Sequence, residues 1–128
     1  MIKLLAIALG GAIGALFRYG LSGAVHAFLS GMYPWGTLAV NLIGSFLIGF
    51  LWHVSEEVIL APHLKMFVFV GILGGFTTFS TYMLETMHLL RDGETGLALG
   101  NLLLSNLLGI MLVFAGFMLS QYVLTLFK

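Results

Sequence analysis

The sequence contains no cysteine and very little charge. Its 128 residues include five basic and five acidic side chains, so only 8% are charged and the formal net charge is zero. Without cysteine the chain can build neither a disulfide framework nor a thiolate metal site. Soluble domains carry about 25% charged residues, so a soluble class is excluded. The zero net charge also argues against nucleic acid as a partner.

Apolar residues take the place of the missing charge. They make up 60% of the chain, and the mean hydropathy is +1.11. A helix that crosses a bilayer needs roughly 20 mostly apolar residues. Four segments qualify: about Ile2 to the low twenties, about Thr37–Val54, about Met66–Leu90 and about Leu97–Phe127. We therefore predict an all-α membrane protein, with residues 1–128 forming a single transmembrane domain in the lipid bilayer.

The few basic residues are divided almost evenly between the two sides that four spans create. The side with both termini has Lys3, Lys65 and Lys128, and the opposite side has Arg91 and, if it lies near the end of its span, Arg18. A clear Lys/Arg excess normally fixes orientation, and none is present. Two interpretations stay open: one weakly specified topology, or insertion in both orientations with assembly as an antiparallel pair.

Polar side chains recur at helical spacing within three of the spans. Residues four apart share a helix face, which predicts three polar stripes: Thr37, Asn41 and Ser45; Asn101 and Ser105; and Thr77, Thr81 and Glu85. Such stripes either join helices by hydrogen bonds or line a route for a solute. Neutral donors suit a small anion that must shed its water, and they suit water or a small polar solute equally well.

Ionisable residues at the span ends have two interpretations each. Arg18 either draws anions into a vestibule or extends to the headgroups. Glu85 is either a proton-coupling carboxylate or a capping partner. The four histidines, His26, His53, His63 and His88, lack metal-ligand spacing and are interpreted as interfacial. No nucleophile with a base, no paired carboxylates at mid-membrane and no phosphate loop is apparent, so we do not predict an enzyme.

The stretch "GILGGFTTFSTY" at 71–82 interrupts the third span with two adjacent glycines and four hydroxyl side chains. These residues predict a break at mid-membrane. A break is tolerated only where the freed backbone is buried in protein or faces a cavity or an ion. Phe79 and Tyr82, three residues apart, would share a face and could present positively polarised ring edges to an anion.

At these residues the chain resembles the Fluc family of fluoride channels, also called CrcB proteins, over essentially its whole length. The motifs are "GGAIGALFRY" at 10–19, "GTLAVNLIGSFLIG" at 36–49 and "GGFTTFSTY" at 74–82. The resemblance implies a dual-topology, antiparallel homodimer of four-helix subunits with a broken third helix. It further implies two fluoride pathways and a structural sodium ion at the dimer interface.

The resemblance also implies roles for individual residues. The backbone carbonyls of Gly74 and Thr77 would hold the sodium ion. The fluoride pathway would comprise the carboxamide of Asn41, the rings of Phe79 and Tyr82, the hydroxyls of Ser80, Thr81, Thr37 and Ser105, the vestibule residue Arg18, and Glu85 near the pore end. The sequence departs from better-known members at Tyr82, where they carry Phe, and at Asn101, where Tyr is frequent.

The implied function is passive, fluoride-selective conduction out of the cytoplasm across a bacterial inner membrane, which would confer fluoride resistance. The alternative is a small dual-topology multidrug exporter, which needs an acidic residue deep in its cavity, typically in the first span. The first span here contains none. A second alternative is a membrane assembly subunit that transports nothing and whose polar stripes only join helices.

Overall fold

The computed structural model describes residues 1–126, and its regular secondary structure is entirely helical. The elements are α1 (Ile2–Phe28), α2 (Trp35–Glu57), α3 (Pro62–Lys65), the π-helix η1 (Met66–Leu73), α4 (Gly74–Phe76), α5 (Phe79–Arg91) and α6 (Thr95–Leu126). Four stretches are long and apolar enough to cross a membrane: α1, α2, Pro62–Arg91 and α6. The predicted number of spans is therefore confirmed.

The helices extend beyond the predicted spans because polar residues at the ends continue them. α1 continues to Phe28, α2 covers Trp35–Glu57, the third span begins at Pro62, and α6 begins at Thr95. At the end of α2, Trp52 donates from its indole nitrogen to Glu56, one turn further on, at 2.9 Å. Such a pair supports a helix that composition alone would end. The predicted end at Phe127, and Lys128, lie outside the described residues.

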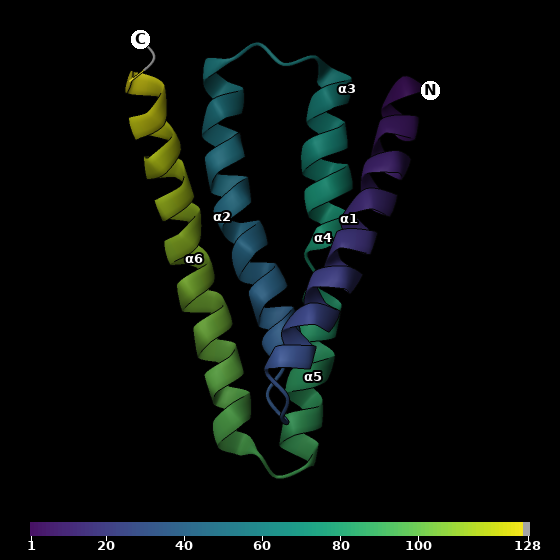
Figure 1. Ribbon diagram of the computed structural model, residues 1–128, viewed down its shortest axis with the longest axis vertical. Helices are drawn as coiled ribbons and strands as arrows, with labels where there is room; N and C mark the ends of the chain where they lie inside the picture. The colour runs from purple at the N-terminus through teal and green to yellow at the C-terminus, as the bar shows by residue number, and fades with distance from the viewer. Residues whose placement is uncertain (127–128) are drawn as a thin grey trace.

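The helices cross the molecule in alternating directions (Figure 1). The start of α1, the end of α6 and the α2–α3 connection lie at one end of the molecule, and the α1–α2 and α5–α6 connections lie at the other. α2 packs along α6, and α1 packs along η1 and α4. Lys3 and Lys65 are accordingly at one end and Arg91 at the opposite end, which is the division of charge that four spans require.

Glycines allow α1 and the third span to approach at the backbone. A Cβ on Gly71 would lie 2.8 Å from the Cα of Gly10, and one on Gly75 would lie 2.6 Å from the carbonyl oxygen of Gly11. Only glycine permits so short a separation. By contrast, a Cβ on Gly96 or Gly100 would meet no described atom within 4 Å. Gly96 and Gly100 therefore make no close helix contact within the described part of the chain.

His53, interpreted from the sequence as interfacial, is buried within the subunit. Its side chain lies between α2 and α6, where Nδ1 is 2.7 Å from the hydroxyl of Ser120, a residue with 0% exposure. The imidazole ring also meets the Phe117 ring edge-on, with 4.7 Å between centroids. The serine hydroxyl makes the hydrogen bond to the imidazole that water would otherwise make, and this bond joins α2 to α6.

The third span departs from α-helical conformation at two places along its length. Residues 66–73 form a π-helix, α4 ends at Phe76, and α5 begins at Phe79. Between them Thr77 (φ −81°, ψ 159°) and Thr78 (φ −148°, ψ 122°) are extended. Within a span, residues outside a helix leave backbone groups that need other partners.

Candidate functional site

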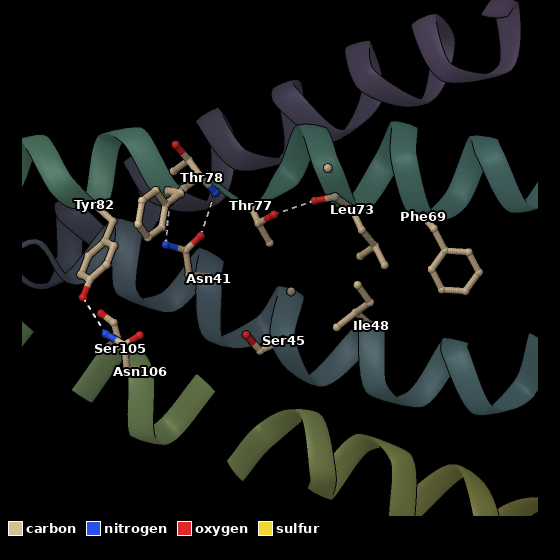
Figure 2. Close-up of a pocket in the computed structure, with 13 residues that line it drawn as sticks. Asn41, Ser45, Ile48, Phe69, Leu73, Thr77, Thr78, Tyr82, Ser105 and Asn106 are labelled. Atoms are coloured by element: carbon tan, nitrogen blue, oxygen red, sulfur yellow. Dashed lines mark hydrogen bonds between the residues drawn. The ribbon is translucent and has the colours of Figure 1, made fainter. Parts of the chain in front are cut away.

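The extended residue Thr78 is held from α2 by one carboxamide. Asn41 donates from Nδ2 to the carbonyl oxygen of Thr78 at 2.9 Å, and its Oδ1 accepts from the Thr78 amide at 2.8 Å (Figure 2). The hydroxyl of Thr78 then accepts from the amide of Thr81 at 3.3 Å and so caps α5. Threonine favours this N-cap position because its side-chain oxygen satisfies a free helix amide.

A cavity of about 380 Å³ opens beside these residues, and we call it the break cavity. Its polar or aromatic lining includes Asn41, Ser45, Phe79, Tyr82, Ser105 and Asn106, together with Gly74, Thr77 and Thr78 of the third span. Phe79 and Tyr82 meet edge to face, with 5.8 Å between ring centroids. Hydroxyls, carboxamides and ring edges therefore share one hollow between α2, the third span and α6 (Figure 2).

A second cavity of about 610 Å³, here called the arginine cavity, lies against α1. Arg18, Thr37 and Thr81 line it, and Thr78 lines both this cavity and the break cavity. The guanidinium of Arg18 donates to the carbonyl oxygen of Thr77 at 3.3 Å. Arg18 thus lies beside the extended residues, and it brings a positive charge to a hollow otherwise furnished with neutral donors.

Glu85 lies in a third cavity of about 270 Å³, the loop cavity, near the α1–α2 connection. One carboxylate oxygen accepts from the hydroxyl of Thr37 at 2.8 Å, while the other is buried without a partner among the described residues. The hydroxyl of Tyr33, in the same lining, is also buried and unpartnered there. Burial raises the pKa of the Tyr33 phenol, so Tyr33 stays a neutral donor.

Eight of the nine residues assigned to the pathway thus divide among the three cavities. Asn41, Phe79, Tyr82 and Ser105 line the break cavity; Arg18, Thr37 and Thr81 line the arginine cavity; and Glu85 lines the loop cavity. Ser80 is exposed on α5 and lines none of the three cavities. Hydrogen bonds connect residues of different cavities: Arg18 of the arginine cavity donates to Thr77 of the break cavity, and Thr37 of the arginine cavity donates to Glu85 of the loop cavity.

The prediction that Thr77, Thr81 and Glu85 form one helical stripe was wrong. It assumed a continuous helix, but Thr77 precedes α5 and lines a different cavity from Thr81. The hydroxyl of Thr77 instead donates to the carbonyl oxygen of Leu73 at 2.9 Å. This is the bond to a preceding carbonyl that a threonine makes when it faces its own helix.

Several polar residues of the site were not assigned from the sequence. Thr78 holds the break, Asn106 contacts Tyr82, and Thr86 connects α5 to α6 through Asn101. Asn106 had a detectable signal, because a second carboxamide within an apolar span is costly unless it has a partner. Its partner was not deducible, since the spacing within α6 says nothing about which residue of α5 faces it.

Comparison with known proteins identifies the family. The family model described as "CrcB-like protein, Camphor Resistance (CrcB)" matches residues 5–117. This chain belongs to the CrcB family. The match includes the three motifs on which the resemblance was based, and the predicted membership is confirmed.

Individual CrcB relatives are similar along nearly their whole length. A protein of Parabacteroides distasonis is 44% identical over 128 residues, which is 100% of each chain. One of Salinibacter ruber is 52% identical over 91% of this chain and 87% of its own. One of Magnetococcus marinus is 48% identical over 91% and 96%, respectively. All three carry the name "Fluoride-specific ion channel FluC".

Proposed function

We propose that this protein is a passive, fluoride-selective ion channel, not an enzyme, that exports cytoplasmic fluoride and so confers fluoride resistance. The observation that carries the proposal is the shared name of its relatives, one of which aligns with 100% of both chains. The cavities agree with it chemically. Their polar lining is mostly hydroxyl, carboxamide and ring edge, and Arg18 is the one guanidinium in the three linings.

Neutral donors are suited to a small anion that must lose its water. Hydroxyl and carboxamide hydrogens replace the hydration of fluoride without binding it as firmly as a fixed cation would. A narrow route lined with such donors compensates the dehydration of fluoride but fits the larger chloride ion poorly, and so it favours fluoride. The charge of Arg18 raises the local concentration of anions at the entrance of the route.

The membrane potential is sufficient to drive export. Fluoride enters cells as its neutral weak acid and is trapped when the acid ionises. An inside-negative potential then favours exit of the anion by about 2.3 kcal/mol per 100 mV. No coupling ion or ATP is required, which agrees with a bacterial inner membrane as the location.

The route we propose runs through the cavities described above. An anion enters beside Arg18, Thr81 and Thr37, passes the Asn41–Thr78 contact, and reaches Phe79, Tyr82 and Ser105. Thr78 supports this order, because it lines both the arginine cavity and the break cavity. Glu85, bonded to Thr37, lies at the entrance end of the route. Ser80 joins the route from the surface of α5 when a second subunit covers that surface.

We infer that two copies assemble as an antiparallel, dual-topology homodimer. Phe79 is 72% exposed and Met87 45%, so α5 presents apolar side chains beyond the subunit. The near balance of basic residues between the two ends favours neither orientation. A second copy would cover α5 and close the break cavity from outside.

We propose that the third helix is broken and that a structural sodium ion lies between the two copies. The Gly74 and Thr77 carbonyls of each subunit would hold this ion. In a continuous helix the Thr78 amide would bond to the Gly74 carbonyl, but it donates to Asn41 instead. The Gly74 carbonyl is thereby released. The Thr77 carbonyl accepts from Arg18 and retains a second lone pair for a cation. Carbonyl oxygens are suitable ligands for a hard cation.

The decisive experiment is ion efflux from liposomes that contain the purified protein, followed with a fluoride electrode and with matched chloride-loaded vesicles, without a proton gradient. We expect rapid, voltage-driven loss of fluoride with chloride retained. Absence of fluoride loss from vesicles shown to contain folded dimer would refute the channel. The exporter alternative would instead require flux of an organic cation coupled to protons. The absence of Asp and Glu from α1 disfavours that alternative.

A further inference from the structure

The side chain of Tyr82 is anchored from α6 at its hydroxyl. Tyr82 lies on α5 with 4% exposure, and its hydroxyl oxygen is 2.9 Å from Nδ2 of Asn106 (Figure 2). Both residues line the break cavity. The contact joins residues 24 positions apart on neighbouring helices.

The direction of this hydrogen bond follows from a second contact of Asn106. The same Nδ2 lies 2.7 Å from the carbonyl oxygen of Leu102. A carbonyl only accepts, so the atom beside it must be the amide nitrogen, which only donates. Tyr82 therefore accepts from Asn106, and its phenolic proton is not used in this bond. No acceptor for that proton occurs among residues 1–126.

The backbone of Tyr82 is connected to α6 through Thr86 of its own helix, α5. Its carbonyl oxygen accepts from the hydroxyl of Thr86 at 2.8 Å, and that hydroxyl accepts from Nδ2 of Asn101 at 2.9 Å. Ser105 in turn donates to Asn101 at 3.4 Å. α6 thus holds Tyr82 directly at its hydroxyl and, through Thr86, at its backbone. The phenolic O–H of Tyr82 is therefore positioned before any ion arrives.

We propose that Asn106 is a positioning residue for anion selectivity, which acts by donating to Tyr82 and leaving the phenolic proton free to donate to an anion in the break cavity. This inference rests on the proposed channel function. A phenylalanine at position 82 would offer only a ring edge. A hydroxyl donor favours the anion with the greater demand for hydrogen bonds, which is fluoride rather than chloride.

The test is a double-mutant cycle of Tyr82→Phe and Asn106→Leu, read as the ratio of fluoride to chloride efflux from liposomes. Each single substitution is expected to lower the ratio about 3- to 10-fold, the value of one hydrogen bond. In the presence of Tyr82→Phe, Asn106→Leu should have less than about a twofold further effect, because it acts only through the hydroxyl. Additive effects of the two substitutions would overturn the proposal.

Asn106→Asp tests whether Asn106 acts by donating to the Tyr82 hydroxyl or only by holding the ring in place. A carboxylate keeps a bond to Tyr82 but accepts its proton, which removes that donor from the cavity. We expect the ratio to fall more with Tyr82 present than with Tyr82→Phe, where only the added charge acts. An equal fall in both backgrounds, or an unchanged ratio, would contradict the role of the proton.

Two controls keep failures distinguishable. Ser120→Ala also removes a polar group from α6 but lies in none of the three cavities, so it should leave the ratio unchanged. If the unsubstituted protein passes no fluoride, the proposed function fails and this inference falls with it. If it conducts and Tyr82→Phe, eluting as the same folded species, keeps the ratio within about twofold, only the role of Tyr82 and Asn106 is refuted.

Discussion

At the scale of single residues, Asn41 both supports the backbone of Thr78 and contributes polar groups to the site. Its carboxamide uses one oxygen and one nitrogen to satisfy the amide and carbonyl of Thr78, and it also lines the break cavity. The two explanations offered by its sequence position, joining helices and lining a route, are therefore not exclusive. A substitution must be followed in both flux and stability.

Asn41→Leu is expected to reduce fluoride efflux at least tenfold and to destabilise the folded protein. It leaves two backbone groups of Thr78 unpaired in an apolar setting, which costs about 1–3 kcal/mol for each group. Fluoride efflux from liposomes and the unfolding midpoint in detergent measure the two effects. Ser55→Ala, which removes a bond to Trp52 on the same helix, should leave efflux unchanged. Normal efflux by a destabilised Asn41→Leu dimer would show that Asn41 only joins helices and has no part in the fluoride route.

At the scale of elements, the third span is shaped by its neighbours on both sides. α1 approaches it at Gly10 and Gly14, where an added Cβ would meet the carbonyl oxygens of Phe67 and Ile72, respectively. On the other side, Asn41 of α2 supplies the partners that extended Thr78 lacks within its own span. The conformation of residues 66–78 thus depends on two flanking helices.

Gly10→Ala is expected to destabilise the fold by about 1–3 kcal/mol, because a methyl group would force α1 away from η1. Chemical unfolding in detergent micelles measures the change. Gly11→Ala is the matched control in the same helix, since its Cβ would meet no described atom within 4 Å. Equal stability of the Gly10 and Gly11 variants would show that close backbone contact between α1 and η1 does not hold the subunit together.

At the scale of the whole molecule, one subunit leaves most of the apolar surface of its outer helices uncovered. Only 11% of the most apolar window of α1 is buried within the described chain, and the same holds for α6. In a bilayer such a surface meets lipid or another protein chain. Because the basic residues are divided almost evenly between the two ends, neither orientation in the membrane is favoured.

Dual topology is testable because the chain has no cysteine of its own. Glu94→Cys, in the exposed α5–α6 connection, should be labelled from outside the cell by an impermeant maleimide in about half of the copies, since neither orientation is preferred. Ile59→Cys, at the opposite end, should behave identically. Full labelling of one position and none of the other would establish a single topology.

The sequence by itself predicted the features that depend on local composition and spacing. Four apolar runs predicted four spans, and three motifs predicted the CrcB family. The spacing of Thr37 and Asn41 predicted that both lie on one face of α2, and both do bond to the same neighbour, the third span, because α2 is a continuous helix. Periodicity is a reliable guide wherever the helix that it assumes is unbroken.

Only the tertiary structure decided which side chains meet across helices. The extended backbone at Thr77 and Thr78 removed Thr77 from the face of Thr81. The same structure paired Tyr82 with Asn106 and buried His53 against Ser120. These contacts depend on the relative rotation and translation of helices, which the packing of all their side chains sets together. Spacing within one helix contains no information about that rotation, so the hydroxyl of Tyr82 acquired a partner that the sequence did not reveal.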